Sequence, residues 1–184
     1  DLYVLPEMFS TGFHTDAIQV AEPMDGPTIK WLKLLSAEIG SAIATSLCIT
    51  EEGKYYNRFC FVEPTGQITT YDKRHLFAYG NESKNYTPGT EKMIVEYKGV
   101  RFLLQTCYDL RFPVFSRNCK DYDAIIYVAN WPTTRLNAWR TLLRARAIEN
   151  QCYVIGANRV GSDLQCEYPG CSAIIHPYGH ADEE

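Results

Sequence analysis

The sequence lacks long apolar runs, clusters of basic residues and phosphate-binding glycine loops, and each absence excludes a class of protein. No stretch approaches the roughly 18 consecutive apolar residues of a transmembrane helix, so we expect no membrane partner. The formal net charge of −4 comes without any run of Lys and Arg, which argues against nucleic acid as a partner. Because no glycine-rich phosphate loop is present, the sequence offers no motif for a nucleotide cofactor.

The cysteines also lack the regular spacing of a disulfide framework or a zinc site. Their number, 7, is odd, and several lie within apolar, strand-like runs. This usage suits the reducing cytoplasm better than an oxidising compartment. Cys166 and Cys171 are followed by His176 and His180, but the spacing matches no common zinc pattern. We therefore expect a cytoplasmic protein that needs neither a metal nor another cofactor.

What is present is the composition of an ordinary globular domain, with 184 residues of which 46% are apolar and 22% charged. Strand-like and helix-like segments alternate without an internal repeat, low-complexity tract or linker, which predicts one α/β domain over residues 1–184. Residues 2–5 already resemble a strand, and the chain stops soon after another at 172–175. We therefore expect the domain to be truncated at both ends.

Hydrophobic periodicity and turn residues predict the individual elements. Apolar residues at helical spacing follow Gly26-Pro27-Thr28 and stop at Gly40, which predicts a helix between these points. Thr133 or Thr134 is expected to cap a second helix that runs to about Glu149. We expect antiparallel strands at 41–50, 55–62 and 67–71, a hairpin at 93–97 and 100–106, buried strands at 123–129 and 152–157, and loops at 8–23 and 78–89.

Cys107 follows an apolar run and directly precedes a turn-forming segment that ends in Pro113. The pattern predicts a buried strand that delivers a thiol to the point where strand gives way to turn or helix. Reactive groups tend to lie at such strand ends in α/β proteins. A lone cysteine in this position is more often a small buried hydrophobe, so the catalytic interpretation depends on the residues upstream.

Two further polar residues, Glu7 and Lys73, come directly after predicted strands. With Cys107 they supply a base, a cation and a soft nucleophile, which together suffice for acyl transfer. A nearby ammonium favours the thiolate, and a carboxylate can take its proton. Lys73 and the backbone N–H of Tyr108 could stabilise the negative charge that develops on a carbonyl oxygen. In isolation, Glu7 would be a solvated turn residue and Lys73 an exposed surface lysine.

These residues belong to motifs that resemble the nitrilase superfamily of carbon–nitrogen hydrolases, and within it the ω-amidase branch. The three motifs are Leu-Pro-Glu at 5–7, Tyr-Asp-Lys-Arg-His-Leu-Phe at 71–77 and Cys-Tyr-Asp-Leu-Arg-Phe-Pro at 107–113. Their order and approximate separations also fit. Agreement extends to residues 56–58, 82–83, 130–132 and 144–150, so the resemblance covers nearly the whole chain.

The resemblance implies an α-β-β-α sandwich of the nitrilase type and a Glu-Lys-Cys triad. In this chain, Glu7 would be the general base, Lys73 would stabilise the tetrahedral intermediate, and Cys107 would form a thioester that water hydrolyses after ammonia leaves. Glu82 matches a second glutamate that holds the lysine and helps to activate water. The resemblance also implies small monoamides of α-keto dicarboxylic acids as substrates, and a homodimer or larger homo-oligomer.

The substrate's carboxylate calls for an arginine, which the sequence does not single out. Arg111 lies close to Cys107 in sequence, although it could instead pair with Asp109 or Glu149. Arg58 and Arg135 are the alternatives. Trp131 is a candidate wall of the substrate pocket beside Tyr108 and Cys107.

Other functions stay open at this level. Another nitrilase-superfamily activity, such as that of a nitrilase, carbamoylase or N-acyltransferase, would use the same triad with a different pocket. A binding protein that only retains the fold would not need Glu7, Lys73 and Cys107 together. A Cys-His hydrolase would depend on His75, which lies on the side of Lys73 if both belong to a strand.

Overall fold

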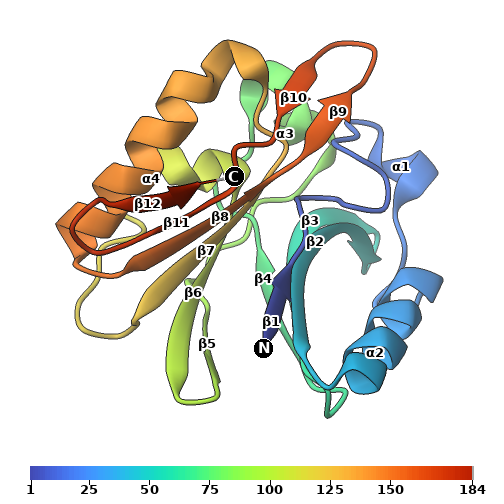
Figure 1. Cartoon of the computed structure of the whole chain (residues 1–184). Coiled ribbons are helices and arrows are strands. Elements are labelled where there is room, and N and C mark those ends of the chain that lie inside the picture. The colour runs from blue at the N-terminus through green and yellow to red at the C-terminus, as the bar shows by residue number, and fades with distance from the viewer. Residues whose placement is uncertain (184) are drawn as a thin grey trace. The chain divides into compact units, whose positions relative to one another are not determined.

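The computed structural model describes residues 1–183, and the chain divides into two compact units, Asp1–Glu91 and Lys92–Glu184. We describe each unit by itself (Figure 1). Residue 184, the last of the expected domain, lies outside the described residues. The expectation of a single domain over residues 1–184 stays a prediction.

The first unit is built on a four-stranded sheet in the order β1-β2-β3-β4. Strand β1 runs parallel to β2, whereas β2, β3 and β4 pair antiparallel through short turns. The bounds are β1 Leu2–Val4, β2 Ala42–Glu51, β3 Lys54–Val62 and β4 Ile68–Asp72. The antiparallel pairing predicted from the short turns is confirmed.

Helix α2 (Pro27–Ile39) connects β1 to β2 and lies against one face of this sheet (Figure 1). Pro occupies the first helical position, where its fixed φ suits the helix and its missing N–H costs no hydrogen bond. Gly40 ends the helix with a φ of 62°, a conformation that glycine adopts without strain. Ile29 and Leu32 are buried in one cluster with Ile43 and Val62 of the sheet. Both predicted ends of this helix are confirmed.

The predicted loops of the first unit contain short helical segments instead of irregular structure throughout. They are α1 (Ala17–Val20), a 3₁₀ turn, η1 (Ala78–Gly80), and α3 (Glu82–Asn85). Asn81 separates the last two with a φ of 59°. The expectation of loops at 8–23 and 78–89 was therefore wrong in part, because a single helical turn is too short to show hydrophobic periodicity.

The second unit is built on a six-stranded sheet in the order β12-β11-β8-β7-β6-β5. Strands β6, β7 and β8 are parallel, whereas β5 pairs antiparallel with β6, β11 with β8, and β12 with β11. The bounds are β5 Ile94–Tyr97, β6 Val100–Thr106, β7 Ala124–Ala129, β8 Tyr153–Asn158, β11 Ala173–Ile175 and β12 Ala181–Glu183; β9 Val160–Ser162 and β10 Glu167–Pro169 form a separate hairpin. The predicted hairpin and the buried parallel strands are confirmed, with β7 buried along its whole length.

Helix α4 (Leu136–Asn150) packs on this second sheet through Trp139, Leu143 and Ala147. The predicted cap was wrong, because a 3₁₀ turn, η3 (Thr133–Arg135), precedes the helix. The Thr133 hydroxyl donates to the carbonyl of Glu167 at 3.1 Å instead of accepting from the helix's first N–H groups. A long-range partner thus competes successfully with the local cap.

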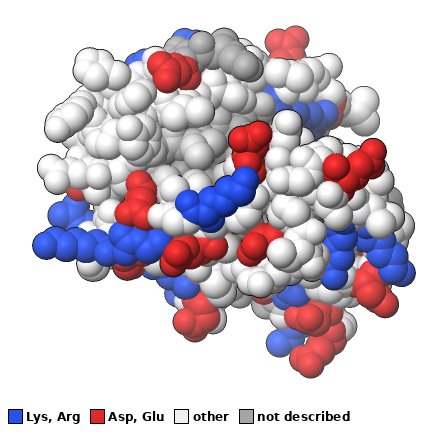
Figure 2. Space-filling model, turned by 60° about the horizontal axis from the view of Figure 1, so that its bottom comes forward, with Lys and Arg blue, Asp and Glu red and all other residues white. Residues whose placement is uncertain are grey.

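Figure 2 shows Lys and Arg side chains interspersed with Asp and Glu side chains over part of the drawn face, beside areas without charge. Among the described residues, ion pairs join Arg101 to Asp123 and Lys92 to Asp121, each at 2.7 Å. Within residues 1–183, no helix combines the length and apolar character needed to cross a membrane.

Candidate active site

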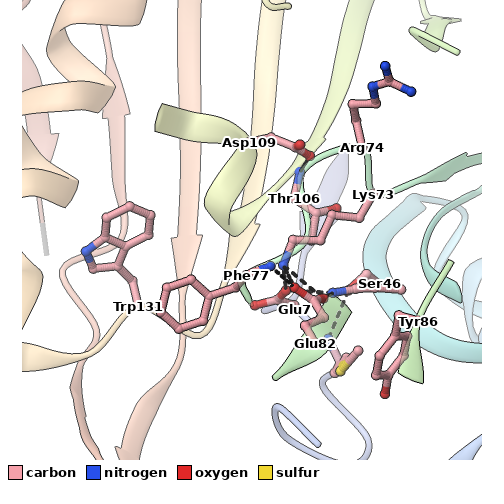
Figure 3. Close-up of polar contacts among 12 residues, drawn as sticks. Glu7, Ser46, Lys73, Arg74, Phe77, Glu82, Tyr86, Thr106, Asp109 and Trp131 are labelled. Carbon is pink, nitrogen blue, oxygen red and sulfur yellow. Dashed lines mark hydrogen bonds and ion pairs between the residues drawn. The ribbon is translucent and has the colours of Figure 1, made fainter. Parts of the chain in front are cut away.

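A buried cluster of charged side chains brings together Glu7, Lys73 and Glu82 of the first unit. The Lys73 ammonium lies 2.9 Å from Oε1 of Glu7, 3.1 Å from Oε1 of Glu82 and 2.9 Å from Oε2 of Glu82 (Figure 3). The exposed fractions of these residues are 1%, 1% and 0% for Glu7, Lys73 and Glu82. The structure therefore brings together three of the four catalytic candidates, and one cation is shared by two acids.

Glu7 is held in place because its neighbours on both sides are tied to β2. The Leu5 N–H donates to the carbonyl of Ala44 at 2.8 Å, which continues the parallel pairing beyond β1. The Thr45 hydroxyl donates to the carbonyl of Pro6 at 2.8 Å. On the other side, the Met8 N–H donates to the Ser46 hydroxyl at 3.0 Å. The Leu-Pro-Glu motif thus fixes a carboxylate at the end of a strand.

Lys73 follows β4 directly and is bracketed by two backbone hydrogen bonds. Its N–H donates to the carbonyl of Asn57 at 3.0 Å, and its carbonyl accepts from the N–H of Gly89 at 3.0 Å. Gly89 has to be glycine at this close approach, since a Cβ would lie 2.1 Å from the carbonyl oxygen of Asp72. The segment 88–89, which the sequence marked only as part of a polar loop, thus helps to position the lysine.

Asn57 of β3 joins the two carboxylates and was not among the predicted site residues. Its Nδ2 donates to Oε1 of Glu7 at 2.7 Å and to Oε1 of Glu82 at 2.9 Å. The residue is fully buried. The agreement of residues 56–58 with the family was the one signal in the sequence, but it did not distinguish Asn57 from its neighbours.

The electrostatics of the cluster favour proton uptake by a carboxylate. Burial raises the pKa of Glu82 above its ordinary value of 4.5, and the negative charge of Glu7 adds to this effect. The ammonium of Lys73, the amide of Asn57 and the N–H of Phe77, which donates to Oε2 of Glu82 at 2.6 Å, lower the pKa and oppose the rise. Two carboxylates and one ammonium leave an excess negative charge, so the cluster has the means to act as a base.

Cys107 belongs to the second unit and occupies the first position of η2 (Cys107–Arg111), directly after β6. The predicted change from strand to turn at this residue is confirmed. Its φ is 47°, a left-handed conformation that costs energy for any residue with a Cβ. The side chain is half-buried. Strain of this kind is concentrated at functional residues, which supports a special role for this thiol.

The turn that carries Cys107 is held by buried hydrogen bonds. The Thr106 N–H donates to Oδ2 of Asp109 at 3.0 Å (Figure 3). Arg146 of α4 donates from Nη2 to the carbonyl of Leu110 at 2.6 Å and from Nη1 to Oε1 of Glu149 at 2.9 Å. The left-handed conformation of Cys107 is therefore supported from both the strand and the helix of its unit.

The three predicted substrate-binding residues lie in the second unit, and two of them are in contact. The guanidinium of Arg111 lies over the ring of Trp131, 5.2 Å from its centroid. The Tyr108 ring packs edge-on against Phe112, with 5.3 Å between the ring centroids. The structure thus gives Arg111 an aromatic partner, Trp131, whereas Glu149, one of the two acids suggested by the sequence, pairs with Arg146. Contact with an aromatic face leaves an arginine's N–H groups able to bind a carboxylate.

The two alternative arginines have different surroundings. Arg58 is almost fully buried, and its guanidinium donates to both oxygens of Asp72, at 2.7 and 3.0 Å, and to Glu51 at 2.9 Å. Two acids already neutralise its charge, which argues against its alternative assignment to a substrate carboxylate. Arg135 is exposed, and its backbone carbonyl accepts the indole N–H of Trp131 at 2.8 Å.

The argument that placed His75 on the side of Lys73 was also wrong. Strand β4 ends at Asp72, so the alternation of side chains along a strand does not extend to residues 73–75. The Lys73 ammonium donates to the carboxylates of Glu7 and Glu82.

Comparisons with known proteins identify the family of this chain. A family model for carbon–nitrogen hydrolases matches residues 1–181. Omega-amidase YafV of Escherichia coli (strain K12) is 48% identical over 180 residues, which are 97% of this chain and 70% of that protein. 2-oxoglutaramate amidase of Bacillus subtilis (strain 168) is 36% identical over 184 residues, which cover 97% of this chain and 71% of that protein.

Solved structures show the same fold. A CN-hydrolase superfamily protein from Xanthomonas campestris, with an arsenic adduct in its active site, matches with a TM-score of 0.97 and 48% identity over 100% of this chain and 73% of its own. Nit3 of Saccharomyces cerevisiae, from branch 10 of the nitrilase superfamily, matches with a TM-score of 0.87 and 26% identity over 100% of this chain and 72% of its own. The nitrilase-type α/β fold class expected from the sequence is confirmed. The chain therefore belongs to the carbon–nitrogen hydrolase family.

Proposed function

We propose that the chain is an ω-amidase that hydrolyses small monoamides of α-keto dicarboxylic acids to the acid and ammonia. Its family and its relatives support an amidase, since relatives 36–49% identical are named as ω-amidases or as a 2-oxoglutaramate amidase. The observation that carries the proposal is the buried cluster in which Lys73 is shared by Glu7 and Glu82.

In the first half of the proposed reaction, the Cys107 sulfur attacks the amide carbonyl carbon while its proton passes to Glu7. Lys73 stabilises the negative charge that forms on the carbonyl oxygen. The carbon–nitrogen bond then breaks, and the nitrogen takes the proton from Glu7 and leaves as ammonia. The product of this half is a thioester between Cys107 and the acyl group.

In the second half, water attacks the thioester carbon and gives a proton to Glu7, which passes it to the departing sulfur. The acid is released and the thiol is restored, so the sum is amide plus water to acid plus ammonia. Glu82 holds Lys73 throughout, as its two hydrogen bonds from the ammonium indicate. No metal or other cofactor is required by these steps.

We assign the substrate's carboxylate to Arg111, with Trp131 and Tyr108 beside it. The support is the contact of Arg111 with the Trp131 ring and its position in the turn that begins at Cys107. A cation on a flat aromatic surface suits a planar α-keto acid, because guanidinium and carboxylate can form paired hydrogen bonds. We also propose that the protein is cytoplasmic, because its cysteines are free thiols. The family resemblance supports a homo-oligomer.

The decisive measurement is ammonia release from succinamate, glutaramate and their α-keto analogues, by the parent protein and by Cys107→Ala. We expect release by the parent alone, with a preference for the α-keto amides. If the parent released nothing while Cys107 was alkylated readily at neutral pH, the activity would belong to another nitrilase-superfamily reaction. If Cys107 were also inert, the proposed function would be wrong.

A second pair of variants separates the triad from a Cys-His mechanism. We expect Glu7→Gln to abolish ammonia release and His75→Ala to retain it. The reverse result would identify His75 as the base. Light scattering on a size-exclusion column tests the homo-oligomer, and elution as a monomer would contradict it.

A further inference from the structure

Asn57 is a neutral residue that forms hydrogen bonds with the charged cluster of the first unit. Its single amide nitrogen donates to a carboxylate from the Leu-Pro-Glu turn and to a carboxylate from α3. Its backbone carbonyl accepts the N–H of Lys73 at 3.0 Å. One buried residue of β3 therefore contacts Glu7, Lys73 and Glu82 at once.

The hydrogen bonds that the carboxylate oxygens accept show how the cluster affects protonation of Glu7 and Glu82. Oε1 of Glu7 accepts from Lys73 and from Asn57. Oε1 of Glu82 accepts from the same two residues, and Oε2 of Glu82 accepts from Lys73 and the Phe77 N–H. An amide nitrogen can only donate, so a proton added to an oxygen that faces Asn57 would oppose the amide's own hydrogen.

We propose that Asn57 is a positioning residue that favours the ionised forms of Glu7 and Glu82 by donating to both carboxylates. This inference rests on the proposed function and adds a residue to it. Glu82, whose oxygens each accept two hydrogen bonds, remains the fixed partner of Lys73.

An amide suits this position better than the alternatives because it donates twice without carrying a charge. A lysine or arginine would neutralise the excess negative charge that makes the cluster a base. A hydroxyl has one hydrogen and could donate to only one of the two carboxylates. Among the described residues, the buried Oδ1 of Asn57 has no hydrogen-bond partner, so the two carboxylates account for the polar contacts of the side chain. Burying an unpaired oxygen costs free energy. This cost indicates that the site requires the amide nitrogen of Asn57 as a hydrogen-bond donor.

The experiment compares Asn57→Leu and Asn57→Asp with the parent protein. Leu keeps the approximate size but donates nothing, and Asp keeps the shape but adds a third negative charge. Hydrogen bonds to a carboxylate lower its pKa, so their loss raises the apparent pKa of the pair. We expect the acidic limb of kcat/KM for ammonia release to move up by about one pH unit in Asn57→Leu, and by more in Asn57→Asp.

The same shift is measured without activity by following the glutamate Cδ resonances through a pH titration of the Cys107→Ala protein. Glu7→Gln and Glu82→Gln assign the two signals. Asn150→Leu is the matched control, because Asn150 is also buried but its Nδ2 donates to the carbonyl of Arg146 and its Oδ1 accepts from the Asn118 N–H. We expect this control variant to lose stability but to leave the titration midpoints of Glu7 and Glu82 unchanged.

Unchanged titrations in folded Asn57→Leu and Asn57→Asp would overturn the inference and leave the proposed function intact. A shift of the two resonances without ammonia release by the parent would support Asn57's effect on the carboxylates and reject the amidase. A shift equal to that of Asn150→Leu would also overturn the inference, since it would reflect general loosening. If Asn57→Leu did not fold, Asn57→Asp alone decides, because it keeps the shape of the native side chain.

Discussion

At the scale of single residues, the site is marked by conformations and charges that cost stability. Cys107 has a left-handed backbone, and Glu7, Lys73 and Glu82 are ionisable groups out of contact with water. Neither feature strengthens the fold, because strain and desolvation both oppose folding. The proposed function accounts for both features, because it needs a fixed thiol and a water-free base.

The strain at Cys107 can be measured by comparing Cys107→Gly with Cys107→Ala. Both variants lose the sulfur, and we expect both to be inactive. Gly accepts a φ of 47° whereas Ala does not, so Cys107→Gly should have a free energy of unfolding higher by about 0.5–1 kcal/mol. Urea denaturation of the two variants checks this. Equal stabilities would mean that the turn relaxes when the sulfur is removed.

The raised pKa of Glu82 predicts how stability depends on pH. The folded protein holds this proton above pH 4.5, the ordinary carboxyl pKa, whereas the unfolded chain has released it. The contribution of Glu82 to the free energy of unfolding is therefore complete below that pH and is lost as the pH rises through the folded pKa.

Glu82→Gln lacks this titration, so the stability of the parent relative to Glu82→Gln should fall as the pH rises from 4.5 towards neutrality. Urea unfolding of both proteins over this range gives the difference at each pH. A difference that stayed constant, or that grew with pH, would show that Glu82 is not protonated more readily in the folded protein.

At the scale of elements, the catalytic candidates lie where strands end and another segment closes against them. Glu7 follows β1, Lys73 follows β4 and Cys107 follows β6. Strand pairing fixes the backbone up to these points, and nearby loops complete the hydrogen bonds beyond them. A loop residue can therefore affect a catalytic candidate without carrying any reactive group.

Gly89→Ala tests this for Lys73. The added Cβ would lie 2.1 Å from the Asp72 carbonyl oxygen, so the segment must move and its hydrogen bond to Lys73 must lengthen. We expect a loss of about 1–3 kcal/mol in the free energy of unfolding and a fall in kcat. Gly53→Ala is the control, because its Cβ has open space and only a φ of 75° is strained. If both variants lost stability but retained the same kcat, Gly89 would not position Lys73.

At the scale of the whole molecule, the thiols divide according to burial. Burial raises the pKa of Cys60 and Cys152 to about 12 and also raises the pKa of Cys48. The other cysteines are half-buried or exposed, namely Cys107, Cys119, Cys166 and Cys171. Because the thiolate is the reactive form, burial and a raised pKa both protect Cys48, Cys60 and Cys152 from reaction.

Iodoacetamide at neutral pH should therefore modify the half-buried and exposed cysteines of the native protein and leave Cys48, Cys60 and Cys152 unmodified. In urea, all 7 cysteines should react. Peptide mass spectrometry after each treatment locates the label. Native labelling of Cys60 or Cys152 would contradict the packing of the sheets that bury them.

The sequence by itself determined the features that depend on neighbouring residues. Periodicity and turn residues predicted α2, the antiparallel β2-β3-β4 strands and the β5-β6 hairpin, because the hydrophobic face and the turn are local properties. The motifs predicted that Glu7, Lys73 and Cys107 end strands, and the order of the motifs indicated the family. Single-turn helices and the N-terminus of α4 escaped prediction, since a few residues show no period and Thr133 has a distant partner.

Only the tertiary structure decided which polar groups meet. Asn57 joins Glu7 and Glu82, which lie 50 and 25 residues away in the chain, and no local pattern encodes a hydrogen bond over such distances. Arg58 was a candidate for the substrate until strand pairing placed it opposite Asp72. Short local motifs are therefore enough to identify the candidate reactive residues. Their hydrogen-bond partners depend on the register of the strands, because that register determines which side chains pack together in three dimensions.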